Sequence, residues 1–163
     1  VSIITEKSLD DLDNLVDEIE ITISFQDGDG DLGLDKNGID KGNPIYSDTL
    51  KNENGEIIFD EEGNIIPNKF GKNFFIDVYK EVDGVYQLVV FPGNQGFSGD
   101  FPLLNVPPDN ETALEGEITY SFQVPVNQGI IFEGDVLKFE IHIADRAKNL
   151  SNIVETTPII LGQ

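Results

Sequence analysis

Alternation of apolar and polar residues is the feature that most limits how this chain can fold. From residue 19 to residue 25, polar residues stand between the large apolar residues Ile19, Ile21, Ile23 and Phe25. Successive side chains of an extended chain point to opposite faces, so this spacing lets a strand bury one face and leave the other in water. We therefore predict a half-buried β-strand here.

The same spacing returns along most of the chain. Further strands are predicted to begin at Phe74 and to cover residues 86–91, 118–126, 137–143 and 153–161, the last of them interrupted by Pro158 at an edge or a bulge. The sequence Val82-Asp83-Gly84-Val85 is typical of a tight hairpin turn. Six strands separated by turns, with hardly any helical pattern, predict an all-β fold, an antiparallel β-sandwich.

Three stretches depart from this pattern. Residues 1–16 are acidic and carry leucines at helical spacing, so we expect an N-terminal tether or a short helix there and a single domain over residues 17–163. Residues 36–72 alternate on both sides of Asp60-Glu61-Glu62-Gly63, which predicts an inserted hairpin. Residues 92–110 are expected to form a long loop.

Composition limits the partners of the chain. The net charge is −21, from 31 acidic and 10 basic residues, so we expect no binding of nucleic acid through charge, and cations are the natural partners. The chain has no cysteine, which rules out disulfides and zinc-thiolate sites. No run approaches the roughly 18 apolar residues of a membrane span, so no transmembrane segment is expected in this chain.

Residues for catalysis are scarce, and we expect a protein that is not an enzyme. The only histidine, His142, alternates with apolar residues and should therefore point away from the core as a surface side chain. Without cysteine or a well-placed histidine, neither Ser-His-Asp nor Cys-His machinery can be assembled. A pair of carboxylates at glycosidase spacing could arise among so many acidic residues, but no motif points to hydrolysis.

The most specific motif is Asp27-Gly28-Asp29-Gly30-Asp31-Leu32-Gly33, which follows the first predicted strand. Three carboxylates at alternate positions, separated by glycines that permit a tight backbone, suit a loop that wraps one hard cation, and Ca²⁺ is the expected one. The loop departs from an EF-hand, because Leu32 and Gly38 stand where that motif requires Gly and Glu. Further ligands would come from Asp35, Asp40 or elsewhere. The alternative is an acidic, solvated turn.

A second motif, Asp145-Arg146-Ala147-Lys148-Asn149-Leu150-Ser151-Asn152, joins the last two predicted strands. It resembles the last hairpin of bacterial immunoglobulin-like domains, in which Gly is usual where Lys148 stands. Together with residues 25–33, it is similar to an uncharacterised group of Bacteroidetes cell-envelope lipoproteins. The resemblance implies an immunoglobulin-like sandwich of about seven strands, export to the periplasm or the outer-membrane surface, and lipid anchoring. It implies no known activity.

This fold would bring the two motifs together. In an immunoglobulin-like sandwich, residues 19–25 and 137–143 run in the same direction and end at the same pole. Asp145 and the side chain of Asn149 could then complete an oxygen shell begun by Asp27, Asp29 and Asp31. Alternatively, Asp145 and Asn149 serve only their own turn through local hydrogen bonds. Arg146 could neutralise excess carboxylate beside the ion, but we expect it to lie exposed on the rim.

Two functions remain open at this point. The first is a non-enzymatic, calcium-stabilised immunoglobulin-like module with a structural or protein-interaction role in an exported envelope protein. The alternative is a glycan-binding module of a polysaccharide-capture system, which would use the long loops. Sugar sites usually present aromatic faces, and the chain has no Trp. The aromatic residues in irregular segments are Tyr46, Phe59, Phe70, Phe97 and Phe101.

Overall fold

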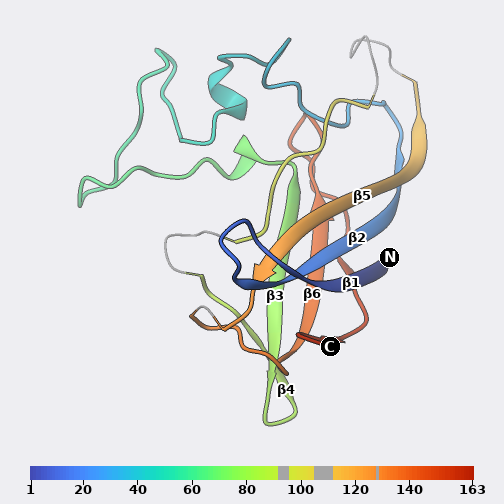
Figure 1. The fold of residues 1–163 in the computed structure, drawn as a ribbon. Helices are drawn as coiled ribbons and strands as arrows, with labels where there is room; N and C mark the ends of the chain where they lie inside the picture. Colours follow the sequence, from blue (N-terminus) through green and yellow to red (C-terminus); the bar gives the residue numbers. More distant parts are fainter. Residues whose placement is uncertain (92–95, 105–111, 128) are drawn as a thin grey trace.

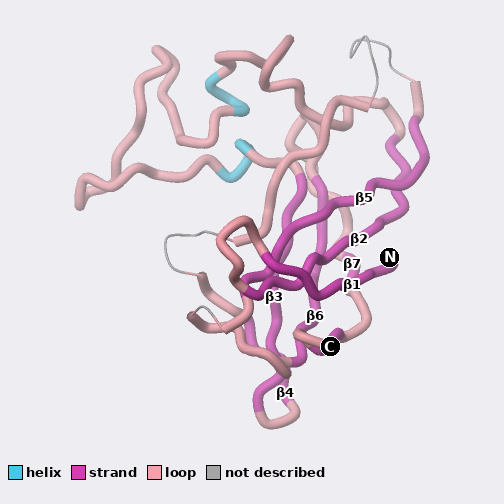
Figure 2. The backbone as a smooth tube through the Cα atoms, viewed as in Figure 1, coloured by secondary structure: helices cyan, strands magenta, loops and turns pink. Residues whose placement is uncertain are grey.

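The chain folds into two antiparallel β-sheets packed face to face, as Figures 1 and 2 show. The computed structural model describes residues 1–91, 96–104, 112–127 and 129–163. The strands are β1 (Ser2–Leu9), β2 (Leu15–Asp27), β3 (Phe74–Val82), β4 (Val85–Leu88), β5 (Leu114–Pro125), β6 (Val136–Ile143), β7 (Val154–Glu155) and β8 (Ile159–Ile160). The short 3-10 helices are η1 (Pro44–Tyr46) and η2 (Lys69–Gly71). The predicted all-β sandwich is confirmed.

The division of strands between the sheets is of the immunoglobulin type. One sheet has the order β1-β2-β5, and the other has β4-β3-β6-β7, with β8 also paired to β6. The first, second and fifth strands therefore face the third, fourth, sixth and seventh. Much of the predicted loop 92–110 lies outside the described residues.

The core forms where the alternating faces of the two sheets meet. The predicted apolar face of β2, with Ile19, Ile21 and Ile23, packs in one cluster with Phe139 and Ile141 of β6. Ile19 and Phe139 have no exposed surface. Burial of large apolar side chains is the main favourable contribution to folding, so the period of two determines which residues form the core.

The predicted turns that shape the second sheet are present. Asp83 and Gly84 join β3 to β4 with φ angles of 53° and 79°, and two successive positive φ values match a tight hairpin turn with the strand twist. Pro158 separates β7 from β8, which both pair with β6. Both features agree with the sequence-based predictions.

Residues 1–16 are neither a tether nor a helix, which corrects that prediction. Ser2–Leu9 forms β1 and pairs antiparallel with β2 from Ser2↔Thr22 to Leu9↔Leu15. The leucines at helical spacing do not share a buried face, since Leu9 and Leu12 are 61% and 81% exposed. Backbone pairing to β2 outweighs the weak local preference for a helix. The sandwich therefore begins at β1 rather than at residue 17.

The insertion between β2 and β3 projects from one end of the sandwich, as the cyan and green segment in Figure 1 shows. Phe59 and Ile65 form a bridge around the predicted Asp60–Gly63 turn. Three backbone hydrogen bonds around this turn form a closed ring that was not predicted. Leu50 donates to Ile66 at 2.9 Å, Ile66 to Ile58 at 3.4 Å, and Ile58 to Leu50 at 2.9 Å.

This ring follows a short repeat in the sequence. Asn52, Asp60 and Asn68 each stand two residues after a ring residue, and each accepts backbone N–H groups of its own turn. Such side chains stabilise turns through local hydrogen bonds. The insertion is therefore an ordered element built from repeated turns.

Candidate metal centre

The acidic loop leaves the end of β2 and folds into a compact cluster of carboxylates. One oxygen from each of Asp27, Asp29 and Asp31 lies within 4.8 Å of the others. Glycine makes this path possible: Gly33 has a φ of +100°, and a Cβ there would lie 2.2 Å from the carbonyl oxygen of Pro102. The sequence-predicted triad is therefore brought together.

Two carboxylates of the cluster, those of Asp27 and Asp31, resist ionisation. Burial, together with the charges of Asp145 and Asp29, raises the pKa of Asp31 to about 6. Burial and the neighbouring Asp29 also raise the pKa of Asp27. Desolvation and like charges both disfavour the charged form of a carboxyl group. A bound cation would favour the charged forms of these carboxyl groups, because its positive charge offsets the negative charge of the cluster.

Two oxygens of this cluster lack a partner. Asp27 Oδ2 and Asp31 Oδ1 are buried and accept no hydrogen bond from the described residues. Buried carboxylate oxygens are normally hydrogen-bonded, paired or bound to a metal, because an unsatisfied one costs free energy. Carboxylate oxygens are also the ligands that Ca²⁺ prefers. The donor set therefore fits a hard cation.

The loop that follows β6 lies against this cluster. Leu32 and Asp145 form a backbone bridge. The amide of Arg146 donates to the Asp31 carbonyl at 3.2 Å, and the amide of Ala147 donates to Asp31 Oδ2 at 3.1 Å. The expectation that β2 and β6 end at the same pole is therefore correct for their loops.

Asp145 and Asn149 are engaged with each other. Asp145 Oδ1 accepts from the backbone amide of Asn149, and Asp145 Oδ2 accepts from its side-chain amide, both at 2.7 Å. These bonds are the local turn contacts that the sequence left open as an alternative. Asp145 nevertheless lies close enough to Asp31 to raise its pKa. Lys148, at the position where Gly is usual, still adopts a φ of 70°.

Asp35 and Asp40, the other suggested ligands, do not join the cluster. The carboxylate of Asp35 accepts the backbone amides of Gly38 and Ile39 in its own turn. Asp40 is buried and accepts two hydrogen bonds of 2.7 Å from the guanidinium of Arg146.

Arg146 is not an exposed rim residue, which corrects that expectation. Its side chain is 18% exposed, and its guanidinium lies 5.3 Å from the ring centre of Tyr46. The Tyr46 hydroxyl in turn donates to the Arg146 carbonyl at 3.1 Å. The long gap between residues 40 and 146 hid this contact in the sequence, because neither residue belongs to a recognisable pair motif.

His142 lies on the face of β6 opposite the core, as its alternation predicted. Its ring stacks on Phe75 with centroids 4.8 Å apart, and burial lowers its pKa. Of the aromatic residues suggested as sugar platforms, Phe101 is buried, and Phe97 packs against the core. Tyr46 lies against Arg146. Phe59 is 54% exposed, and Phe70 has Lys69 and Lys148 near its ring.

A scan against protein-family models found no match, and searches of curated proteins and of solved structures found none either. Within the described residues, no helix is long and apolar enough to cross a membrane.

Proposed function

We propose that this protein is a non-enzymatic, calcium-stabilised immunoglobulin-like module in which Asp27, Asp29 and Asp31 bind one Ca²⁺. The observation that carries the proposal is the pair of buried, unpartnered oxygens, Asp27 Oδ2 and Asp31 Oδ1, within that cluster. A cation bound there would satisfy both oxygens and offset the repulsion among the three carboxylates.

The surroundings of the triad favour a metal ion over a protein cation. Among the described residues, no Lys or Arg forms a salt bridge with Asp27, Asp29 or Asp31, and the nearby Arg146 is held by Asp40. Ca²⁺ suits the site better than Mg²⁺, because it accepts a flexible shell of roughly 6 to 8 oxygens that includes water, whereas Mg²⁺ demands a small and regular octahedron.

The proposed role of the ion is to stabilise one pole of the sandwich. The triad begins at Asp27, the last residue of β2, and Asp31 contacts the loop after β6 through backbone and side-chain hydrogen bonds. A ligand that binds only the folded state stabilises that state by mass action. The ion would thus hold together two loops that come from different sheets.

The biological setting is proposed from the resemblance of the two motifs to envelope lipoproteins. We propose that the module belongs to an exported protein at the periplasm or the outer-membrane surface and that its role there is structural or one of protein interaction. The high negative charge accords with this setting, because a calcium-rich exterior can neutralise clustered carboxylates.

Thermal unfolding in three buffers, which contain Ca²⁺, Mg²⁺ or a chelator, tests the calcium site. We expect the melting temperature to rise by several degrees in millimolar Ca²⁺ relative to a chelator, with a smaller rise in Mg²⁺ at equal ionic strength. Isothermal titration should give one saturable site. Equal melting temperatures in all three buffers would refute the proposal and leave an acidic turn.

A further inference from the structure

The insertion between β2 and β3 has no buried apolar core of its own. No apolar side chain from residue 41 to residue 70 is buried. The backbone ring of Leu50, Ile58 and Ile66 and the hydrogen bonds of the turns hold the segment together instead. Packing inside the insertion therefore does not account for its large apolar side chains.

The register of the insertion gathers these side chains on one face. Three backbone bridges link its short extended segments in a closed cycle: Lys51↔Ile57, Phe59↔Ile65 and Thr49↔Pro67. Bridged residues share a face, and so do residues two apart in an extended segment. All the bridged residues therefore lie on one face, and the side chains of the ring residues lie on the other.

The face of the bridged residues exposes a contiguous apolar patch, Ile57, Phe59 and Ile65, which we call the insertion patch. These side chains are 41%, 54% and 51% exposed. Phe59 and Ile65 are bridge partners, and Ile57 stands two residues before Phe59, so the three are neighbours. Contiguous exposed apolar side chains rimmed by polar residues mark interaction sites.

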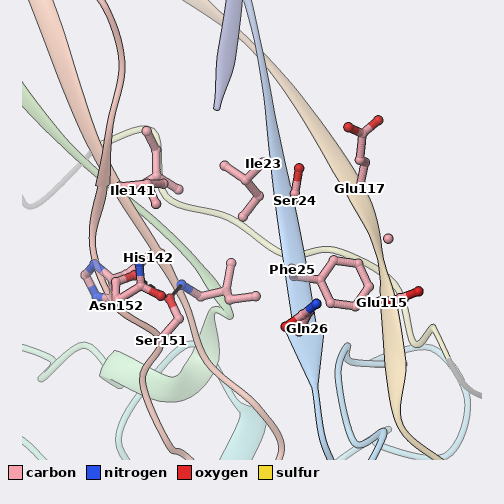
Figure 3. A pocket seen from close by; sticks show the side chains of 13 residues that line it. Ile23, Ser24, Phe25, Gln26, Glu115, Glu117, Ile141, His142, Ser151 and Asn152 are labelled. Carbon is pink, nitrogen blue, oxygen red and sulfur yellow. Dashed lines mark hydrogen bonds between the residues drawn. The ribbon is translucent and has the colours of Figure 1, made fainter.

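The groove between β2 and β6 offers much less free apolar surface. Figure 3 shows Ile23 and Ile141 facing each other across it. Ile23 is only 5% exposed, and Ile141 has no exposed surface. These side chains already belong to the core, whereas the insertion patch keeps about half of its surface in contact with water.

The insertion patch stands on a well-ordered backbone. Asn52 Oδ1 accepts the amide of Glu56 at 2.9 Å, and Asp60 Oδ1 accepts the amide of Asn64 at 2.7 Å. Together with the backbone ring, these bonds fix the two turns that flank the patch. A preformed surface loses less conformational entropy on binding, so a partner meets the patch already arranged for contact.

The charge around the insertion patch indicates the chemistry of its partner. From residue 42 to residue 68 the chain has six acidic residues and one basic residue. Glu53 and Glu56 are exposed on one flanking turn, and Glu61 and Glu62 on the other. Among the described residues, none of these four forms a salt bridge. A basic surface complements them, whereas a second copy of this chain, with a net charge of −21, or an anionic lipid surface is repelled.

We propose that the insertion patch docks on a partner protein whose contact surface is apolar and bordered by Lys or Arg. Ile57, Phe59 and Ile65 supply the apolar contact, and the glutamates of the two flanking turns pair with the basic border. This inference does not depend on the calcium site, which belongs to other loops.

The test uses the capped synthetic peptide Leu-Lys-Lys-Leu-Leu-Lys-Leu-Leu-Lys-Lys-Leu-Leu-Lys-Leu, which as a helix presents an apolar face bordered by Lys. Isothermal titration measures its affinity, and amide chemical shifts of the isotope-labelled protein locate its site. We expect saturable binding with the largest shifts in residues 49–67. The same peptide with Gln in place of each Leu keeps the charge and should not bind.

Matched variants test the apolar contact. Phe59→Thr combined with Ile65→Thr removes apolar surface but keeps residues that favour extended structure, and it should weaken binding at least about tenfold. Val85→Thr combined with Leu88→Thr removes side chains that are 60% and 52% exposed on β4, and it should leave the affinity unchanged. Amide shifts outside the insertion check that each variant keeps its fold.

A second pair of variants tests the charge selection without altering the patch. Glu61→Gln combined with Glu62→Gln should weaken binding about fivefold, the combined effect of two exposed ion pairs. Glu20→Gln combined with Glu81→Gln changes the net charge equally on the strands and should preserve more of the affinity.

Several results would overturn the proposal. They are no saturable binding, equal binding of the Gln peptide, shifts confined to the groove of Figure 3 or to the loop 27–31, and an affinity that the Phe59 and Ile65 substitutions leave unchanged. A dimer in sedimentation, or binding to anionic phospholipid vesicles, that the same substitutions abolish would assign the patch to a different occupant and refute the basic partner.

Discussion

Arg146 holds the buried carboxylate of Asp40 through two hydrogen bonds of 2.7 Å, and this contact ties the insertion to the loop that follows β6. Asp40 is only 3% exposed, so its charge depends on Arg146. The bidentate geometry is the strong form of such a pair. This end of the sandwich therefore contains the carboxylate of Asp40, which is paired with a guanidinium, and the three clustered carboxylates of the triad, which form no salt bridge among the described residues.

Breaking this pair should be costly. We expect Arg146→Met to destabilise the protein by about 3 kcal/mol, because the buried carboxylate of Asp40 loses its charged partner and keeps only the backbone amide of Asp35. Lys138→Met, which removes the more exposed pair with Glu155, should cost less than about 1 kcal/mol. Urea unfolding compares the two variants. Similar costs for both would show that Asp40 is not held by Arg146 in solution.

Asp29→Ala should lower the stability in the presence of calcium but not in its absence. In Ca²⁺ the variant should melt lower than the wild type, because a ligand is lost. In a chelator it should melt at the same temperature or higher, because repulsion on Asp27 is relieved. Asp11→Asn removes one exposed charge from the turn between β1 and β2 and serves as the control. A loss of equal size for Asp29→Ala in both buffers would argue against a metal role for Asp29.

The pH dependence of the metal-free protein should reflect Asp31. Its folded-state pKa is raised to about 6, above the unfolded value near 3.9. The folded state therefore binds more protons between these values, and the stability should fall as the pH rises from about 4 to 6. Asp31→Asn should flatten this part of the profile.

Asp40 acts in the opposite direction and in a lower pH window. Its pKa is lowered, chiefly by the hydrogen bonds from Arg146, so its contribution is lost only as the pH falls below the ordinary range of Asp. Melting in a chelator between pH 5 and pH 7 therefore excludes the contribution of Asp40. The pKa values of Asp27 and His142 are also shifted, so the difference between the wild type and Asp31→Asn is the quantity that reports on Asp31. Identical profiles of the two proteins across that window would contradict the assignment.

Lys148→Gly should stabilise the protein. Lys148 has a φ of 70°, a conformation that costs a residue with a Cβ about 1 kcal/mol and glycine little. Lys148→Ala keeps that cost and removes the amine near Phe70, so it is the matched control. Chemical unfolding should rank Gly above Ala. The reverse order would mean that the turn relaxes in solution.

Gly33→Ala and Gly63→Ala separate steric conflict from backbone strain. Both glycines have positive φ, but a Cβ at Gly33 meets the backbone of Pro102 and Leu103, whereas a Cβ at Gly63 has open space. We expect Gly63→Ala to cost about 1 kcal/mol and Gly33→Ala to cost at least about 2 kcal/mol more, as overpacking against backbone does. Equal losses in unfolding experiments would contradict the close approach at Gly33.

The sequence alone predicted features that depend on local spacing. The alternation of Ile19, Ile21 and Ile23 identified the buried face of β2, because the side-chain direction in a strand follows from the period of two. The same rule placed His142 opposite the core. The acidic triad was also evident, since its residues lie within one short loop. The expected order of the strands then placed the second motif, which begins at Asp145, at the same end of the sandwich as the triad.

Tertiary structure decided the features that depend on which groups meet. Residues 1–16 were expected to form a tether or a short helix, yet residues 2–9 form β1 because β2 offers an edge to pair with. Arg146 is largely buried rather than exposed, because the folded insertion brings the carboxylate of Asp40 to it. Asp145 turned to Asn149 instead of to the triad. A local pattern determines the face on which a side chain lies, but hydrogen-bond and charge partners follow only once distant segments have packed together.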